Sequence, residues 1–116
     1  MKLPADPRDL AVDLLPRSIC SVQVAAVLTD KHGIYSWGWN NVGTCYGMHA
    51  EIHCLLRANR KRLPGSTLYV ASQRQRNLKP VTSKPCLECA AAIRWAKIGK
   101  VLWRAGDERW IEETYA

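Results

Sequence analysis

Residues 85–104 read PCLECAAAIRWAKIGKVLWR, which is the pattern of a helix followed directly by a strand. Pro85 favours the first turn of a helix, and the small and apolar residues after it continue the helix over Cys86–Ile98. Gly99 ends this helix, and Lys100–Arg104 has the length and composition of a strand. The stretch therefore predicts a fold in which helices and strands follow one another.

Helical and strand patterns also alternate over the rest of the chain. Apolar residues at helical spacing predict helices over Arg8–Leu15 and Met48–Arg62, and Asp6 stands at the N-cap position of the first. Apolar runs and period-two alternation predict three more strands, which are Ser21–Thr29, Ile34–Trp39 and Thr67–Ala71. The turn between the first two of these strands makes them a hairpin.

Two segments have less definite patterns. Ser72–Lys84 is polar, basic and without periodicity, which predicts a long loop. Arg109–Thr114 fits either a short strand or a helical turn, and we prefer a strand that pairs with Lys100–Arg104. All elements together predict an α/β fold, a three-layer α/β/α sandwich around a mixed four- or five-stranded sheet, in a single domain over residues 1–116.

The composition is that of an ordinary globular chain. Its 116 residues are 47% hydrophobic and 23% charged, which excludes a disordered chain. No apolar run approaches ~18 residues and the N-terminal residues lack a signal-peptide pattern, so we expect no membrane partner and a cytoplasmic location. Five cysteines, an odd number, predict no disulfide framework, and a close cysteine pair then indicates a metal site or a redox pair.

The charge is strongly positive and unevenly placed. Seventeen Lys and Arg residues against ten Asp and Glu residues give a net charge of +7. Residues 52–87 contain no acidic residue and carry eight of the cations, which are Arg57, Arg60, Lys61, Arg62, Arg74, Arg76, Lys79 and Lys84. This segment favours an anionic partner and predicts a basic approach to the functional site. For its cations, a solvated helix end and a phosphate contact remain open alternatives.

The residues suited to chemistry lie in two short motifs, His49-Ala50-Glu51 and Pro85-Cys86-Leu87-Glu88-Cys89. Cys86 and Cys89 are three apart in the first turn of the expected helix, where the helix dipole favours thiolates. Two thiolates and one imidazole are a three-ligand set for zinc that leaves a fourth position for water. Glu51 would be a base beside that water, a role that neither a structural zinc site nor a redox pair explains. His53 is expected to be a packed or surface histidine.

The two motifs, in this order and with Thr67–Ala71 between them, resemble the zinc-dependent cytidine deaminase superfamily, in which nucleobase deaminases carry H-x-E and P-C-x-x-C. The resemblance spans residues ~20 to 104 and implies zinc ligands, a catalytic acid–base and substrate contacts. The implied zinc (Zn²⁺) ligands are His49, Cys86 and Cys89. The implied catalytic residue is Glu51, which moves protons while water attacks C4 of a cytosine-type base. Implied substrate contacts are the Ala50 backbone N–H with the base carbonyl and Asn40 with the sugar.

The sequence Ser83-Lys84-Pro85-Cys86 also resembles the corresponding segment of small deaminase-like proteins from phage and large-virus genomes. The expected function is hydrolytic deamination of cytosine to uracil in a phosphate-bearing substrate, either a nucleotide or a single-stranded nucleic acid. The expected partner is a cytosine-containing nucleoside or nucleotide, or a single-stranded nucleic acid. The alternative is a catalytically inactive nucleic-acid-binding module that zinc stabilises. Analogy with relatives adds a homo-oligomer to the expected partners.

Several single residues carry narrower expectations. Trp37 and Trp39 fit either stacking on bases or packing in the core, whereas Trp95 and Trp103 are expected in the core. The remaining cysteines are expected to be buried or, for one of them, near the pocket. Cys20 and Cys54 are expected to be buried, and Cys45, in the loop before His49, is the one that could lie near the pocket.

Overall fold

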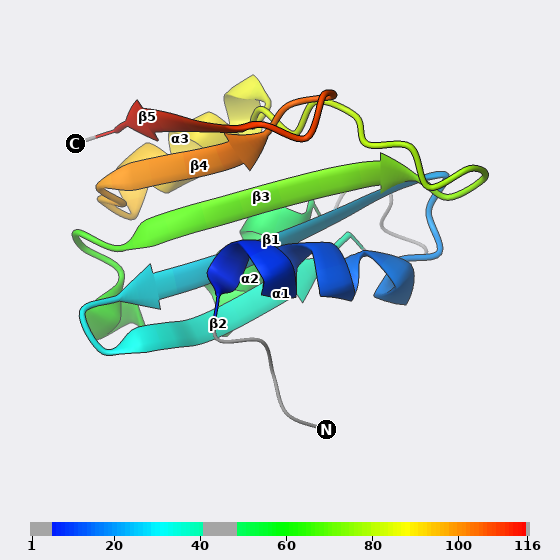
Figure 1. Cartoon of the computed structure of the whole chain (residues 1–116). Helices are drawn as coiled ribbons and strands as arrows, with labels where there is room; N and C mark the ends of the chain where they lie inside the picture. Colours follow the sequence, from blue (N-terminus) through cyan, green and yellow to red (C-terminus); the bar gives the residue numbers. More distant parts are fainter. Residues whose placement is uncertain (1–5, 41–48, 116) are drawn as a thin grey trace.

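The computed structural model describes residues 6–40 and 49–115, which form a mixed five-stranded sheet between two layers of helices (Figure 1). The strands are β1 (Val22–Asp30), β2 (Gly33–Trp39), β3 (Thr67–Arg74), β4 (Lys100–Arg104) and β5 (Trp110–Thr114). The helices are α1 (Pro7–Leu14), α2 (Ala50–Arg57) and α3 (Leu87–Trp95), with short 3-10 helices η1 (Leu15–Arg17) and η2 (Arg60–Arg62). None of the described helices is long and apolar enough to cross a membrane.

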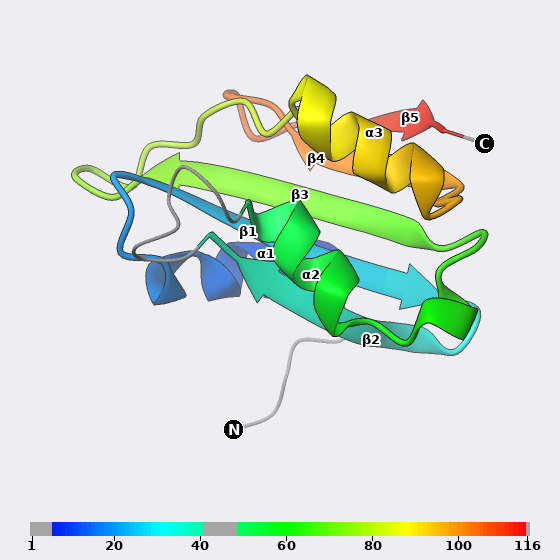
Figure 2. The same cartoon turned by 180° about the vertical axis from the view of Figure 1, so that it is seen from behind.

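The sheet has the strand order β2-β1-β3-β4-β5. β3 and β4 run parallel because α3 connects them as a crossover, and every other neighbouring pair is antiparallel. Helix α1 covers one face of the sheet, while α2 and α3 lie together on the other (Figure 2). This arrangement confirms the predicted α/β/α sandwich and its mixed sheet.

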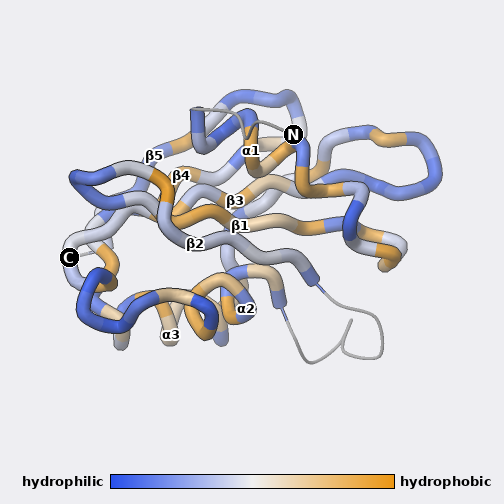
Figure 3. The backbone as a smooth tube through the Cα atoms, turned by 90° about the horizontal axis from the view of Figure 1, so that it is seen from below, coloured by the Kyte–Doolittle hydropathy of each residue, from blue (hydrophilic) through white to orange (hydrophobic). Residues whose placement is uncertain are grey.

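Alternation along β1 divides the core between the two faces of the sheet. Ala25 and Val27 pack under α1, whereas Ala26 and Leu28 pack under α2 and α3, and all four are fully buried. Viewed along the sheet, the two helical layers lie on opposite sides of the apolar central strands (Figure 3). The sheet is therefore covered on both faces, and the two helices of the α2–α3 layer are fixed by one shared cluster.

The helix predicted over Met48–Arg62 is wrong in its length. Its described part, α2, ends at Arg57, and Ala58 turns to an extended conformation with φ −79° and ψ 152°. The Asn59 side chain then accepts a hydrogen bond from the Lys61 backbone N–H at 3.0 Å and caps η2. A short polar side chain that offers the backbone this alternative competes with continuation of a helix.

The loop predicted over Ser72–Lys84 is partly ordered by β-structure. β3 continues to Arg74, and an isolated bridge pairs Gln73 with Pro80. The Arg74 N–H also donates to the Lys79 carbonyl at 2.9 Å, so residues 73–80 form a hairpin at the end of β3, called the β3 hairpin below. At the C-terminal end, β5 pairs antiparallel with β4, as preferred from the sequence.

The expectation that Trp95 fills the core is wrong. Trp95 is 80% exposed, because α3 buries its opposite side through Cys89, Ala90 and Ile93. Ile93 and Trp95 are two residues apart and therefore lie about 200° apart around the helix. Trp103 does pack against the core, and its indole N–H donates to a Glu113 carboxylate oxygen at 2.6 Å.

The cysteines differ in part from expectation. Cys20 is buried, as expected, and it is also disulfide-bonded. The odd number of cysteines predicted no disulfide framework, but an odd total does not exclude a single pair. Cys54 is a free cysteine and is fully buried in the core, as expected. The expectation for Cys45 falls outside the described residues.

Gly38 allows α2 to lie directly on β2. A Cβ atom at this position would be 2.7 Å from the Cys54 backbone nitrogen and 3.0 Å from ring atoms of His53. The Ser36 hydroxyl, on the same strand, donates to the Cys54 carbonyl at 2.8 Å and holds the helix at this distance. Because the nearest atom belongs to the backbone of a helix, it cannot move away cheaply.

We expect Gly38→Ala to lower the free energy of unfolding by about 1–3 kcal/mol, because the added methyl group forces α2 away from β2. Urea denaturation followed by circular dichroism measures this change. The matched control is Gly106→Ala, whose added Cβ would find its nearest atom at 3.9 Å. The control is expected to stay within about 0.5 kcal/mol of the wild type. Equal losses in the two variants would contradict the role of the close contact.

Candidate metal centre and active site

Two helices present the start of their first turns to one place in the structure. His49 is the N-cap residue of α2, and Cys86 is the N-cap residue of α3. The Cys86 sulfur accepts a hydrogen bond from the Cys89 backbone N–H at 3.5 Å, which fixes the first turn of α3. The side chains of these cap residues therefore meet where the positive ends of two helix dipoles also lie.

The structure brings His49, Cys86 and Cys89 together into a cluster with metal-ligand spacing. The Nδ1 atom of His49 lies 3.1 Å from the Cys89 sulfur and 3.5 Å from the Cys86 sulfur. All three potential ligand atoms lie within 4.8 Å of one another. Tetrahedral zinc with standard bond lengths places a nitrogen and a sulfur ligand about 3.5 Å apart and two sulfur ligands about 3.8 Å apart. The cluster therefore fits a zinc ion with only small adjustments.

Glu51 lies beside this cluster and is only 5% exposed. Burial raises the pKa of its carboxyl group above the ordinary value for glutamate. Burial and the neighbouring Glu51 also raise the pKa of the Cys89 thiol. A divalent cation reverses this preference because it stabilises deprotonated ligands. Two thiols, an imidazole and a nearby buried acid are thus a donor set that suits zinc.

A cavity of about 570 Å³ opens beside the cluster. His49, Ala50 and Glu51, at the start of α2, line this cavity and are called its floor below. The potential base and a potential metal ligand therefore line the same space. The other lining residues are Ile19, Cys20, Ser21, Val22, Val24, Asn40, Ser72, Thr82, Ser83, Lys84 and Cys86. The volume is within the range of about 300–1,000 Å³ that is typical of small-molecule sites.

Asn40 and Ala50 both line this cavity. The Asn40 side chain is also part of the sheet edge, since its oxygen accepts from the Val24 N–H at 2.9 Å and its nitrogen donates to the Val22 carbonyl at 2.8 Å. These bonds fix the amide and leave one N–H and one lone pair for a ligand. Ala50 is the first residue of α2, and an N–H group at this position has no acceptor within its own helix.

His53 is packed against β2 and is not part of the metal cluster. Its Nδ1 atom lies 3.1 Å from the Trp39 nitrogen and 3.0 Å from the Trp39 oxygen, and the two rings meet edge to face. Trp39 also lies near the guanidinium groups of Arg17 and Arg57. Trp37 and Trp39 are half-buried against the core under α1, so packing accounts for part of their surface.

The positive segment does not lie as a whole on the approach to the cavity, and this expectation is wrong. The cavity lies at the start of β1 and the end of β3, whereas η2, with Arg60–Arg62, lies near the opposite ends of these strands. Helix α2 has eight residues and therefore carries the chain about 12 Å away from the cluster before these cations occur. Of the eight cations in the segment, only Lys84 is among the described residues that line the cavity.

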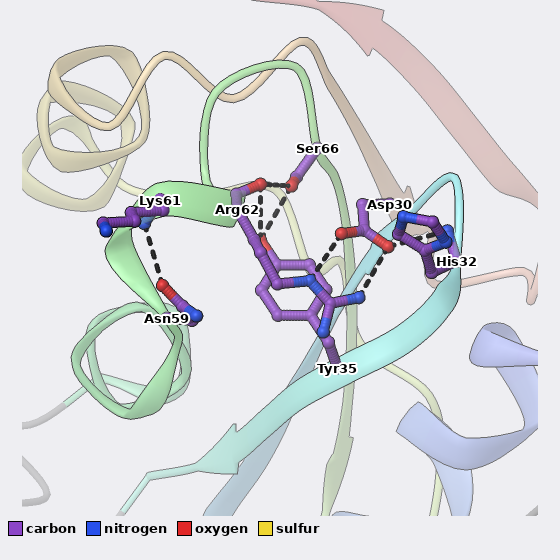
Figure 4. A network of polar contacts seen from close by, with 7 residues as sticks. All are labelled: Asp30, His32, Tyr35, Asn59, Lys61, Arg62 and Ser66. Carbon is purple, nitrogen blue, oxygen red and sulfur yellow. Dashed lines mark hydrogen bonds and ion pairs between the residues drawn. The ribbon is translucent and has the colours of Figure 1, made fainter.

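At that opposite end, Arg62 stabilises the fold through a local network of polar contacts (Figure 4). Its guanidinium group donates to both carboxylate oxygens of Asp30, at 2.6 and 2.7 Å, and lies over the Tyr35 ring. The hydrogen bonds from Arg62 lower the pKa of Asp30 to about 2. The Tyr35 hydroxyl contacts the Ser66 hydroxyl at 2.7 Å. Arg62 thus links η2 to the β1–β2 hairpin through Asp30 and Tyr35.

The sequence motifs did not identify one wall of the cavity, which is formed by residues 19–24. Residues 19–24 contribute five of its lining side chains, although they contain no reactive pattern. Strand pairing is a signal that could have located them, because the antiparallel β1–β2 register pairs Ala25 with Trp39 and so places Val24 beside Asn40. On the other wall, Ser83 and Lys84 directly precede the Pro-Cys motif.

Comparisons with known proteins support the interpretation of the His49–Cys86–Cys89 cluster as a zinc site. Residues 9–105 match the family described as the cytidine and deoxycytidylate deaminase zinc-binding region. A cytidine deaminase from Burkholderia pseudomallei superimposes with a TM-score of 0.74 at 17% identity, over 94% of this chain and 90% of that one.

Two structures of RibD from Acinetobacter baumannii also superimpose, with TM-scores of 0.56 and 0.57 at 24% and 23% identity. They match 81% and 82% of this chain but only 25% and 26% of their own. These structural likenesses show the fold. The family match and the His49–Cys86–Cys89 cluster support zinc as the cofactor and a zinc-dependent deaminase as the general class. The chain belongs to the cytidine and deoxycytidylate deaminase family defined by its zinc-binding region.

Proposed function

We propose that this protein is a hydrolytic deaminase that converts a cytosine base to uracil in a phosphate-bearing substrate, either a nucleotide or a single-stranded nucleic acid. The observation that carries the proposal is Glu51, a carboxyl group that is 5% exposed in the floor of the cavity, beside a zinc-type ligand cluster. A buried acid without a salt bridge costs folding free energy, so a purely structural centre gives no reason to keep it.

The roles follow from where each group lies. His49, Cys86 and Cys89 would hold the metal, and zinc bound there would supply a Lewis acid that brings the pKa of a water molecule nearer to neutrality. Glu51 would accept a proton from the attacking water, carry it to ring N3 and assist the departure of ammonia. Water and the cytosine base are consumed, and uracil and ammonia are formed, so atoms and charge balance.

The substrate contacts use groups that the fold already orients. The Ala50 N–H, in the first turn of α2, donates to the base carbonyl and fixes the ring beside Glu51. Asn40 contacts the sugar with the amide hydrogen and lone pair that its two bonds to β1 leave available. The choice of cytosine is supported by the family description and by the name of the Burkholderia pseudomallei neighbour, which is a cytidine deaminase.

We further propose that residues 1–116 act as one domain. The support is that both clusters of buried residues share a single sheet, so the described elements have no division at which one part could fold without the other. A homo-oligomer remains part of this proposal by analogy alone.

A substrate panel tests the proposed function. We expect the zinc-loaded protein to convert at least one of cytidine, deoxycytidine, their mono- and triphosphates, or cytosine in single-stranded DNA or RNA. Mass spectrometry detects the product by replacement of an amino group with oxygen. If every cytosine compound remains unchanged while the protein holds zinc and binds oligonucleotides, it is an inactive, zinc-stabilised nucleic-acid-binding module and the proposal is wrong.

A further inference from the structure

Lys84 is the one cation among the described residues that line the cavity. It lies two positions before Cys86, and its side chain is exposed. No other lining residue carries a positive charge, and Glu51 in the floor is the only lining carboxyl group in the described part of the chain. An anionic part of a ligand in this cavity therefore has one favourable place, at the wall that carries Lys84.

The backbone on both sides of Lys84 is anchored. The Ser83 N–H donates to the Arg104 carbonyl at 2.9 Å, and the Ser83 and Ser72 hydroxyls lie 2.8 Å apart. Arg104 is itself buried and donates from Nη2 to the Ser72 carbonyl at 3.2 Å. On the other side, Cys86 begins α3 as its N-cap. The Cα of Lys84 thus has a fixed position relative to the metal cluster, although its side chain remains able to move.

Thr82 presents a second exposed polar side chain on the same wall. A lysine ammonium group beside a hydroxyl is a common way to hold a phosphate, because the ammonium supplies charge and the hydroxyl supplies a directed donor. The Ser72 and Ser83 hydroxyls hydrogen-bond to each other and to the Val81 carbonyl. They therefore stabilise this wall of the cavity, and we do not assign them to phosphate binding.

We propose that Lys84, together with Thr82, forms a subsite for a single phosphate group, and that the substrate is a free cytosine mononucleotide. This proposal rests on the deaminase function proposed above and deepens it. It assigns the phosphate to the wall of the cavity that directly precedes the Pro-Cys motif.

The lining of the cavity favours a mononucleotide over a strand. Sites for single-stranded nucleic acid combine several cations along the backbone with aromatic side chains on which bases stack. Here the described lining residues include one lysine and no Phe, Tyr or Trp. Arg60–Arg62 lie toward the opposite end of the sheet, and Arg76 and Lys79 lie on the β3 hairpin without lining the cavity. The cavity therefore resembles a pocket for one small molecule more than a track for a strand.

The test compares Lys84→Gln with Lys79→Gln, which removes the same charge from a lysine that does not line the cavity. Steady-state kinetics use cytidine with its 5′-monophosphate, deoxycytidine with its 5′-monophosphate, and a cytosine-containing single-stranded oligonucleotide. For the wild type we expect kcat/KM to be highest for a monophosphate. Lys84→Gln should lower that value about 10- to 100-fold through KM, as expected for loss of a hydrogen bond to a charged group. Its kcat/KM for the nucleoside and all values of Lys79→Gln should remain unchanged.

Binding provides a readout that does not need turnover. Isothermal titration of the zinc-loaded Glu51→Gln protein should give tighter binding of the monophosphate than of the nucleoside, and Lys84→Gln in that background should abolish the difference. If nothing is deaminated but this phosphate-dependent binding persists, the proposed function fails while the subsite stands. If cytosine compounds are deaminated without any effect of Lys84→Gln, the subsite is wrong. Preference for the oligonucleotide, with steep salt dependence and a loss in Lys79→Gln, would likewise overturn it.

Discussion

The zinc-loaded Glu51→Gln protein is expected to lose turnover by roughly 10²–10⁴-fold while it retains its zinc. Glutamine has nearly the same shape as glutamate, so the floor of the cavity keeps its form, but an amide cannot accept a proton from water and pass it on. Initial rates with the best substrate of the panel, together with metal analysis of the purified protein, measure both parts of this expectation.

The stability of the same variant distinguishes a chemical role from a structural one. Glu51 is buried without a salt bridge among the described residues, so replacing its carboxyl group by a neutral amide removes a desolvation cost. The metal-free variant should therefore be at least as stable as the metal-free wild type in urea denaturation. A group that costs stability and is indispensable for turnover is what a functional site is expected to contain.

Glu88→Gln is the matched control for this prediction. Glu88 also lies in the first turn of a helix and next to a potential metal ligand, but its side chain is exposed. It should keep most of the wild-type activity and the same zinc content. If Glu51→Gln turns over substrate at the wild-type rate, or if both variants lose activity to the same degree, Glu51 is not the proton carrier.

The alternation of elements and the two motifs could be predicted from the sequence because both are local. Pro85 and Gly99 bracket a helix, Lys100–Arg104 has a strand composition, and the structure has α3 and β4 in these places. Convergence of His49 with Cys86 could be predicted because each stands at the start of its helix. Local composition also located β5, although the segment permitted a helical turn.

Features that depend on tertiary context could not be predicted in the same way. The end of α2 depends on the Asn59 cap, which competes with a pattern that otherwise reads as helical through Arg62. The exposure of Trp95 depends on which side of α3 faces the sheet. A count of charges along the chain does not record that α2 carries Arg60–Arg62 to the far end of the sheet. The role of Lys84 emerged only when the cavity wall was known.

Zinc binding is expected to fail in Cys89→Ala, with affinity lower by at least about 100-fold. Loss of an outer-sphere partner alone typically costs 10- to 100-fold, and here one of three ligands is removed. Cys89 is the residue that lies nearest to His49 Nδ1 in the cluster, at 3.1 Å. Metal analysis after dialysis against a weak chelator should find wild-type protein loaded and the variant empty, and deamination should disappear with the metal.

Cys54→Ala is the matched control, because Cys54 is also a free, fully buried cysteine on the same face of the sheet. Both variants lose a buried sulfur atom and both lose packing, so stability alone cannot separate them. The change in melting temperature on adding zinc does separate the two variants. A ligand that binds only the folded state at 100 times its Kd stabilises it by about 2.7 kcal/mol. Wild type and Cys54→Ala should show this rise, and Cys89→Ala should not. A zinc-dependent rise of equal size in all three proteins would mean that Cys89 does not hold the metal, and the proposed centre would have to be abandoned.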